Sequence, residues 1–341
     1  MLSFENDYSE GAHPAILRRL AETNMEQLPG YGTDRYCADA TEKIRRATGC
    51  PDADVWFLVG GTQTNQTVID SITPQYAGVV AAQSGHVNVH EAGAIEFTGH
   101  KVLTLPAHDG RIDANELADY CEGFFADANH DHMVFPGSVY ISFPTEFGTV
   151  YTLAQLEAIG EVCRQYGIPL FVDGARLGYG LTAPGTDVSL QDIARITDVF
   201  SIGGTKVGAL FGEAVVFPRS HSPRHFLTLI KQHGALLAKG WLLGLQFDTL
   251  FTDDLYGTIA AHANDAAETI RTALRDKGYS LTFDSPTNQI FVTLDQQTIS
   301  RLSSHVRIGF MQKADEYHSV MRICTSWATT PEHVAELISL L

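Results

Sequence analysis

Two residues, an aspartate and a lysine, stand where the chain leaves an apolar segment and enters a turn. Asp173 ends the segment PLFVD, and Lys206 lies in the glycine-rich segment GGTKVG that follows DVFSI. Taken singly, Asp173 is also consistent with a turn cap or a Mg²⁺ ligand, and Lys206 with a solvated loop residue. They lie 33 residues apart, which is about one strand-and-helix unit, so both are expected at the same edge of a sheet. A carboxylate and a desolvated amine at one sheet edge can support Schiff-base chemistry.

A third segment supplies a candidate anion site. The residues VWFLVGGTQTNQTVIDSI predict a strand, a diglycine turn and a helix that starts near Thr62. The free N–H groups of Gly61, Thr62 and Gln63 would then face an incoming phosphate, although an ordinary helix N-cap is an alternative interpretation. Together the three features are those that pyridoxal phosphate requires. The lysine forms a Schiff base, the aspartate keeps the pyridine nitrogen protonated, and the helix start binds the phosphate.

Two further residues can complete such a site. His86 follows a predicted strand and would lie over the face of the cofactor ring, although a hydrogen-bonded loop histidine is the alternative. Arg176 lies three residues after Asp173 and can hold a carboxylate through two N–H groups. The spacing of His86, His90 and Glu91 would also permit a metal, but no third ligand motif follows, so we predict no metal site.

The elements that must position these residues are short apolar runs separated by amphipathic segments. This pattern predicts an α/β fold with a mainly parallel, seven-stranded sheet. The predicted strands are Val55–Val59, Gly78–Ala82, Lys101–Leu105, Ser138–Phe143, Leu170–Asp173, Val199–Ile202 and Ala214–Phe217. Between two of them, Thr152–Tyr166 has helical apolar spacing and is followed by Gly167 and Pro169, which end the helix.

The pattern changes at about residue 251. A long helix is predicted over Tyr256–Lys277, strands over Asn288–Leu294 and Val320–Thr325 with a short helix between them, and a last helix from Pro331. We therefore predict a large domain over residues 1–250 and a small C-terminal α+β domain over residues 251–341.

Composition excludes several classes of protein. With 44% hydrophobic and 18% charged residues, the 341-residue chain resembles an ordinary globular protein. Its net charge of −17 would repel nucleic acid and anionic membranes, so neither is an expected partner. No segment approaches the roughly 18 apolar residues of a membrane span, and the first residues lack the pattern of a secretory leader. Five scattered cysteines without a C-x-x-C pair favour the reducing cytoplasm.

Taken together, these residues resemble the threonine aldolase and aromatic amino acid beta-eliminating lyase family, and within it the low-specificity L-threonine aldolases. The resemblance implies the fold-type I architecture of pyridoxal phosphate enzymes and covers nearly the whole chain. The segments that carry it are FENDYSEGAHP, GYGTDRY, SGHVNVHEAGA, VDGARL and GGTKVG.

The resemblance also implies a role for each candidate residue. Lys206 would be the Schiff-base lysine, Asp173 the partner of the pyridine nitrogen, and His86 the ring-stacking residue. The remaining residues would hold the phosphate (Gly61, Thr62 and Gln63), contact the cofactor (Arg176 and Lys231), or bind the substrate (Arg176, Arg322, Asn6, Ser9 and Tyr31). The family implies at least a homodimer, with tetramers usual and with Tyr31 or Lys231 reaching a neighbour's site.

The reaction that this family implies is the aldol cleavage of a β-hydroxy-α-amino acid, such as threonine, to glycine and an aldehyde. His86, directly or through water, would be the base. Two departures from the family pattern concern the site: KQHG has Lys231 where a basic residue with two-pronged geometry is usual, and SFPTEFGTVY has Glu146 and Phe147 where many members carry a histidine. A beta-eliminating lyase is the alternative reaction. A non-catalytic protein that binds pyridoxal phosphate is a less favoured alternative. A nicotinamide enzyme is not favoured, because the chain lacks the glycine fingerprint that binds such a cofactor.

Overall fold

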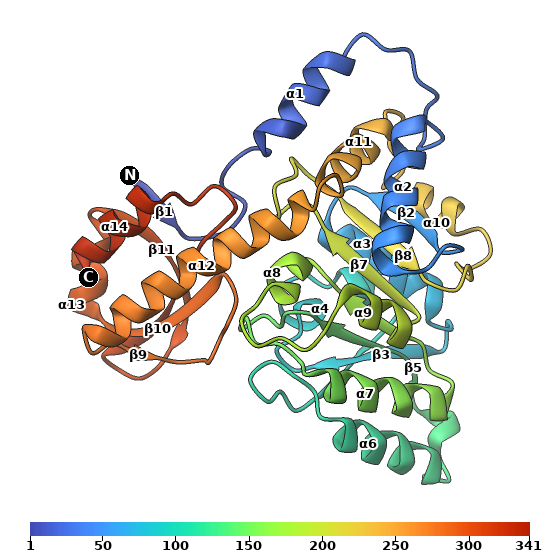
Figure 1. Ribbon diagram of the computed structural model, residues 1–341. Helices are drawn as coiled ribbons and strands as arrows, with labels where there is room; N and C mark the ends of the chain where they lie inside the picture. Colours follow the sequence, from blue (N-terminus) through green and yellow to red (C-terminus); the bar gives the residue numbers. More distant parts are fainter.

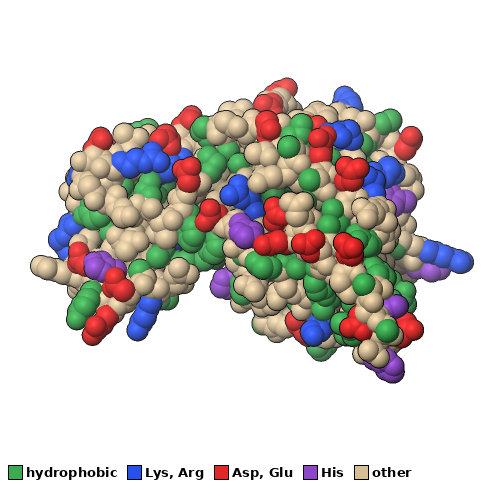
Figure 2. Space-filling model, turned by 90° about the horizontal axis from the view of Figure 1, so that it is seen from below, with side chains coloured by type: hydrophobic (Ala, Val, Ile, Leu, Met, Phe, Trp, Pro, Cys, Tyr) green, Lys and Arg blue, Asp and Glu red, His purple; other side chains and the backbone are tan.

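The computed structural model describes residues 1–341, which form two sheets surrounded by helices (Figure 1). The long helix α12 (Leu255–Asp276) runs from the part that contains the seven-stranded sheet to the part that contains the five-stranded sheet. In the space-filling view a notch separates the two parts, and basic, acidic and histidine side chains meet between them (Figure 2). No helix is both long enough and apolar enough to cross a membrane.

The first sheet confirms the predicted α/β fold. Its strands follow the order β2-β8-β7-β6-β5-β3-β4, and β8 alone runs antiparallel to its two neighbours. The strands are β2 (Asp54–Leu58), β3 (Ala77–Ala82), β4 (Val102–Leu105), β5 (Phe135–Ser142), β6 (Leu170–Asp173), β7 (Val199–Gly203) and β8 (Glu213–Phe217). All seven predicted strands are therefore present, with ends displaced by at most three residues.

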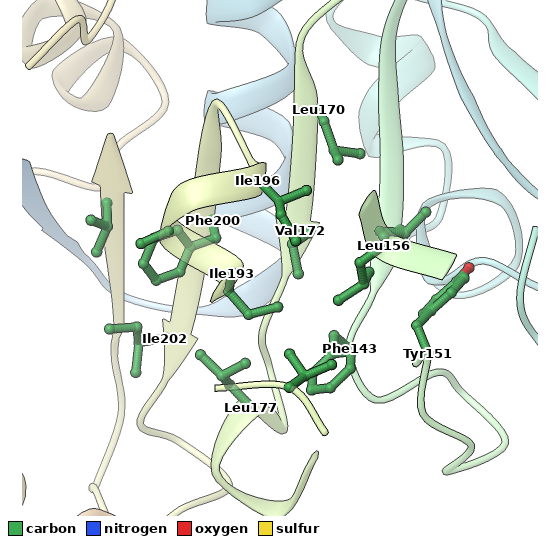
Figure 3. Close-up of a cluster of buried hydrophobic side chains, with 14 of the residues drawn as sticks. Phe143, Tyr151, Leu156, Leu170, Val172, Leu177, Ile193, Ile196, Phe200 and Ile202 are labelled. Atoms are coloured by element: carbon green, nitrogen blue, oxygen red, sulfur yellow. The ribbon is translucent and has the colours of Figure 1, made fainter. Parts of the chain in front are cut away.

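Alternating side chains of these strands enter two separate hydrophobic clusters, one on each face of the sheet. Val172 and Phe200 pack in the first cluster with helices that include α7 (Leu153–Tyr166) and α9 (Leu190–Ile196). Figure 3 shows this cluster, with Leu156, Ile193 and Ile196 over the sheet. Phe171 and Val199 point to the opposite face, where helices α3 (Gly61–Ile72), α4 (His86–Val89), α5 (Ala94–Phe97) and α10 (Phe226–Gln232) pack. Because both faces are covered, the strands have continuous apolar sequences.

Local signals set the ends of the helix that crosses between β5 and β6. Thr152 and Gln155 form a reciprocal capping box at the start of α7, and Gly167 ends the helix in the left-handed conformation at φ 66°. The chain then enters β6, which delivers Asp173 to the carboxyl edge of the sheet. The predicted helix over Thr152–Tyr166 is confirmed.

The remaining helices are α1 (Pro14–Thr23), α2 (Arg35–Thr48), α6 (Ala114–Ala126), the 3-10 helix η1 (His130–His132), α8 (Leu177–Leu181), α11 (Trp241–Leu250), α13 (Gln296–Ser303) and α14 (Pro331–Leu340).

The second sheet has the order β1-β11-β12-β10-β9. Its strands are β1 (Leu2–Phe4), β9 (Ser280–Leu281), β10 (Gln289–Asp295), β11 (Val306–Lys313) and β12 (His318–Cys324). The two strands predicted here are present, whereas β1 pairs in parallel with β11 although we had assigned the first residues to the large domain. A three-residue strand carries too little pattern to be recognised. The boundary near residue 250 stays a prediction.

Candidate active site

A polar cleft with about 400 Å³ of empty space lies at the carboxyl edge of the seven-stranded sheet. It is lined by Gly61, Asn65, His86, Ser142, Pro144, Thr145, Glu146, Asp173, Ala175, Arg176 and Lys206. Five of these were predicted from the sequence, and Glu146 is the residue noted above where many family members carry a histidine. Asn65 and Ser142 are additional polar residues that motif spacing did not reveal.

Lys206 lies in the turn between β7 and β8, is partly buried and lines the cleft. Burial is the largest cause that lowers the pKa of its ammonium group, and the nearby Arg176 cation lowers it further. Tyr179 donates a 2.5 Å hydrogen bond to the carbonyl oxygen of Lys206, which fixes the turn. A lowered pKa favours the neutral amine, which is the nucleophilic form of lysine.

Asp173 is 5% exposed and accepts three hydrogen bonds. The hydroxyl of Tyr140 and the amide of Asn65 donate to Oδ2 over 2.6 and 2.9 Å, and the backbone N–H of Ala175 donates to Oδ1 over 2.9 Å. These donors hold the carboxylate in place. Since Oδ1 accepts only one hydrogen bond within the chain, it can accept a second from a bound ligand.

The start of helix α3 has the properties of an anion site. The N-cap residue Gly60 supplies no side-chain cap, and a Cβ placed on Gly60 or Gly61 would meet no atom within 4 Å. The N–H groups of the first turn, from Gly61 to Gln63, therefore face open space. The side chain of Gln63 is turned away and donates to the carbonyl oxygen of His233 over 3.0 Å, so it contributes its backbone to this site.

His86 is held by two carboxylates. Its ring atom Nδ1 lies 2.7 Å from Oε1 of Glu91, and its backbone N–H donates to Oε1 of Glu146 over 2.8 Å. Glu91 is buried, and the same Oε1 accepts a 2.7 Å hydrogen bond from Asn65, which also donates to Asp173. A carboxylate is an acceptor, so the proton of the neutral His86 ring belongs on Nδ1 and Nε2 is left as the basic atom. Asn65 lies one helical turn after Gly61, and this spacing is the sequence signal that could have identified it.

Arg176 makes a two-pronged contact, but its partner is a residue of the chain. Its Nε and Nη2 atoms donate to the carboxylate of Asp7 over 2.7 and 2.9 Å. Asn288 donates to the same carboxylate over 2.9 Å, so Asp7 connects the cleft with the second sheet. In this structure the N–H pair that we expected to hold a substrate carboxylate is therefore engaged by Asp7. The two residues lie 169 positions apart in the sequence, so no local motif could predict their pairing.

The Asp7–Arg176 pair predicts an acid-sensitive contribution to stability. Burial alone would raise the pKa of Asp7, but the charge and hydrogen bonds of Arg176 lower it to about 2. Because the folded pKa lies below its ordinary value of 3.8, this contribution is present above that value and is lost as the pH falls from about 4 towards 2. Asp7→Ala leaves Arg176 buried without a partner and should lower the free energy of unfolding at pH 7 by about 3 to 5 kcal/mol.

Urea unfolding of both proteins between pH 7 and pH 3 measures this effect. The difference between wild type and Asp7→Ala should shrink on acidification. Glu157→Ala is a matched control, because it breaks an ion pair with Arg195 in which both side chains are about half exposed, and it should cost less than about 1 kcal/mol. Equal losses in the two variants would contradict the buried-pair account.

The substrate residues predicted in the N-terminal segment and in β12 lie near one another. Arg322 donates to the carbonyl oxygen of Glu5 over 3.2 Å and to Gln289 over 3.4 Å. The next residue, Asn6, accepts hydrogen bonds from the backbone of Tyr8 and the hydroxyl of Ser9, each over 3.0 Å. The contacts of Arg322 are single and long, so its guanidinium remains available to an incoming carboxylate. The roles of these residues stay predictions.

Tyr31 and Lys231 are not among the residues that line the cleft. They lie together, with the Lys231 ammonium group 5.0 Å from the centre of the Tyr31 ring. Tyr31 borders a larger apolar groove formed with residues of α2, β2, α10 and α11. The expectation that either residue reaches a neighbour's site stays a prediction.

The groups in the cleft fit pyridoxal phosphate. An uncapped helix start suits the phosphate, the Asp173 carboxylate suits a protonated ring nitrogen, and the buried amine of Lys206 suits the aldehyde carbon. The side chain of Asn65 has an oxygen that is buried without a partner, which is consistent with a missing neighbour at this point of the cleft.

Comparison with known proteins agrees with this arrangement. A sequence model of the beta-eliminating lyase family matches residues 6–307. A low specificity L-threonine aldolase of Pseudomonas aeruginosa is 29% identical over 338 residues, which cover 98% of this chain and 95% of that protein. A Leishmania major threonine aldolase structure is 42% identical, with a TM-score of 0.96 and coverage of 100% and 98%.

More distant structures share the fold alone. A putative L-allo-threonine aldolase of Listeria monocytogenes superposes with a TM-score of 0.75 at 19% identity, covering 99% of this chain and 94% of that one. An aspartate aminotransferase of Thermus thermophilus reaches 0.71 at 14% identity, covering 100% and 90%. These matches confirm the fold-type I architecture. With its cleft, its fold and these relatives in agreement, the chain belongs to the beta-eliminating lyase family.

Proposed function

We propose that this chain is a pyridoxal phosphate-dependent lyase that cleaves a β-hydroxy-α-amino acid of the threonine type to glycine and an aldehyde. The observation that carries the proposal is the meeting of Lys206, Asp173 and the uncapped start of α3 in one cleft. The threonine aldolases of Pseudomonas aeruginosa and Leishmania major, which this chain resembles over nearly its full length, support the choice of reaction.

The cofactor would be held by residues from four segments at the sheet edge. Lys206 would bind its aldehyde carbon, Asp173 its ring nitrogen, and the N–H groups of residues 61–63 its phosphate, with His86 over the ring. When bound, pyridoxal phosphate supplies an electron-accepting ring that stabilises negative charge at the substrate Cα. Asp173 would support this chemistry, because its carboxylate would keep the ring nitrogen protonated.

The protein must also orient the substrate and accept a proton. Arg322, assisted by Asn6 or Ser9, would bind the substrate carboxylate, while Arg176 remains tied to Asp7 and borders the cleft. Cleavage of the Cα–Cβ bond requires removal of the β-hydroxyl proton. Two cleft residues have an atom free for this task, His86 through Nε2 and Glu146 through Oε2.

Product analysis tests the reaction. The purified protein, supplied with pyridoxal phosphate, should convert threonine to glycine and acetaldehyde. Serine and cysteine derivatives that carry a leaving group at Cβ should give little ammonia and keto acid, which are the products of beta-elimination. Keto acid from those derivatives, without glycine from threonine, would favour the eliminating reaction that the family also includes.

We further propose that the active unit is at least a dimer. The groove beside Tyr31 has about 1180 Å³ of empty space, and 11 of its 18 lining residues are hydrophobic. Such a groove on a monomer is a candidate interface. Sedimentation of the wild-type protein should give twice or four times the chain mass of 37.2 kDa, and a monomer would contradict a site shared between subunits.

The compartment proposed for the protein is the cytoplasm. All five cysteines are free, and four of them are buried. Unpaired buried thiols are typical of proteins that work in reducing surroundings. Fractionation of source cells is the direct test.

A further inference from the structure

Glu146 is a carboxyl group whose two oxygens have different surroundings. It lies in the loop after β5 and lines the cleft. Its Oε1 accepts two hydrogen bonds, from the Ser142 hydroxyl over 2.6 Å and from the backbone N–H of His86 over 2.8 Å. Its Oε2 accepts no hydrogen bond from any other residue of the chain and is not buried without a partner. One oxygen therefore anchors the carboxyl group, and the other faces the cleft.

The loop that carries Glu146 is fixed on its other side as well. The next residue, Phe147, stacks on Phe283 with ring centres 4.2 Å apart and planes at 11°, and both rings contact Phe291 of β10. Glu146 thus lies where the loop that lines the cleft packs against the second sheet. A carboxyl group anchored from both directions has little freedom to turn its Oε2 away from the cleft.

The other titratable groups of the cleft have partners or are assigned to the cofactor. Asp173 accepts three hydrogen bonds, Arg176 is paired with Asp7, and Lys206 is assigned to the aldehyde carbon. The ring of His86 is oriented through Nδ1 by Glu91. No other residue of the chain contacts Oε2 of Glu146. This oxygen therefore has no structural role and no assigned role in binding the cofactor.

We propose that Glu146 is a catalytic residue whose Oε2 accepts the proton of the substrate β-hydroxyl group as the Cα–Cβ bond breaks. The O–H electron pair becomes the second bond of the aldehyde C=O, and the electron pair of the Cα–Cβ bond stays with the glycine fragment. The proton passes to Glu146 and from there to solvent, while solvent supplies the proton that completes glycine. This inference rests on the proposed aldol cleavage and assigns its base.

The electrostatics of the site suit this role. Burial is the largest cause that raises the pKa of Glu146, and the negative charge of Asp173 adds to it, whereas the hydrogen bond from Ser142 lowers it. A carboxyl group with a raised pKa is a better proton acceptor and donor near neutrality. The titratable groups that face Glu146 are His86 of α4, Glu91, Tyr140 of β5, Tyr151, Asp173 of β6, Arg176 and Lys206.

The first test compares Glu146→Gln with wild type. The amide oxygen of glutamine can still accept from Ser142 and His86, but the side chain cannot accept the hydroxyl proton. We expect kcat for threonine cleavage to fall by about 100-fold or more, with KM changed less than threefold. Exchange of the α-proton of glycine in D₂O involves no hydroxyl group and should stay within threefold of wild type. An equal loss of cleavage and exchange would indicate a structural role and overturn the proposal.

The second test uses Ser142→Ala and the pH dependence of kcat. A base must be ionised, so the wild-type rate should fall on the acidic side as Glu146 is protonated. Loss of the Ser142 hydrogen bond raises the pKa of Glu146 further, so this acidic limb should move to higher pH in Ser142→Ala. The same limb should be absent in Glu146→Gln. An unmoved limb in Ser142→Ala, or a limb that persists in Glu146→Gln, would assign the base to another group such as His86.

These outcomes are separate from those of the proposed function. If wild type binds pyridoxal phosphate but does not release glycine from threonine, the proposed reaction fails and with it the hydroxyl proton that Glu146 would accept. If wild type cleaves threonine and Glu146→Gln cleaves it within threefold of that rate, only the assignment of Glu146 is wrong.

Discussion

Lys206→Ala is expected to reduce aldol cleavage below detection, a loss of more than about 10⁴-fold, while the fold is retained. Lys206 is the amine in the cleft with a pKa lowered by burial and by Arg176. Alanine removes the nucleophile, and it should cost little stability because the partly buried Lys206 side chain makes no hydrogen bond or ion pair within the chain. Thermal unfolding should therefore stay close to that of the wild-type protein.

Steady-state assays with threonine, run alongside absorption spectra with added pyridoxal phosphate, measure this prediction. Lys101→Ala is the matched control, because Lys101 is an exposed lysine at the edge of the same sheet, and it should have wild-type activity. A Lys206→Ala protein that turns over threonine at even a tenth of the wild-type rate would contradict covalent catalysis by this lysine.

Asp173→Asn is expected to lower kcat by about a thousandfold, equivalent to roughly 4 kcal/mol of transition-state stabilisation. The substitution preserves the size of the side chain, and its amide oxygen can accept hydrogen bonds from Tyr140 and Asn65. It removes the negative charge that would keep the ring nitrogen of the cofactor protonated, so the ring becomes a weaker electron acceptor. Binding of pyridoxal phosphate should weaken less than turnover, since the phosphate site at α3 is unchanged.

Rates with threonine and a titration with pyridoxal phosphate would separate these two effects. The matched control is Asp187→Asn, because Asp187 is exposed and only accepts from the backbone of Leu153. A kcat within tenfold of wild type in Asp173→Asn would show that the carboxylate has no electronic role.

The sheet was predictable largely because strands β3, β6, β7 and β8 are buried along their whole length. In β3, for example, all six residues are buried, so the sequence is a continuous apolar run. Strand β11 (Val306–Lys313) was not predicted, because exposed residues including Arg307, Phe310 and Lys313 interrupt its pattern. Helix α8 (Leu177–Leu181) was not predicted either, because its two glycines lack the usual helical signal.

The site was predictable where its residues follow strands or start a helix. Lys206, Asp173 and Gly61 are such residues, and their common position at one sheet edge follows from the parallel topology. The partners Asp7, Glu91 and Glu146 could not be assigned, since hydrogen bonds between distant segments leave no periodic signal. Arg176 illustrates the limit: its two-pronged geometry was foreseen, but the carboxylate that it contacts belongs to Asp7.

The visible absorption spectrum of the purified protein with pyridoxal phosphate, before and after borohydride, tests directly whether Lys206 binds the cofactor. It is followed by mass analysis of the peptide that contains Lys206. We expect a yellow band that borohydride bleaches, and a reduced cofactor adduct on Lys206. No band after addition of pyridoxal phosphate, or an adduct on a different lysine, would contradict the assignment of this cleft.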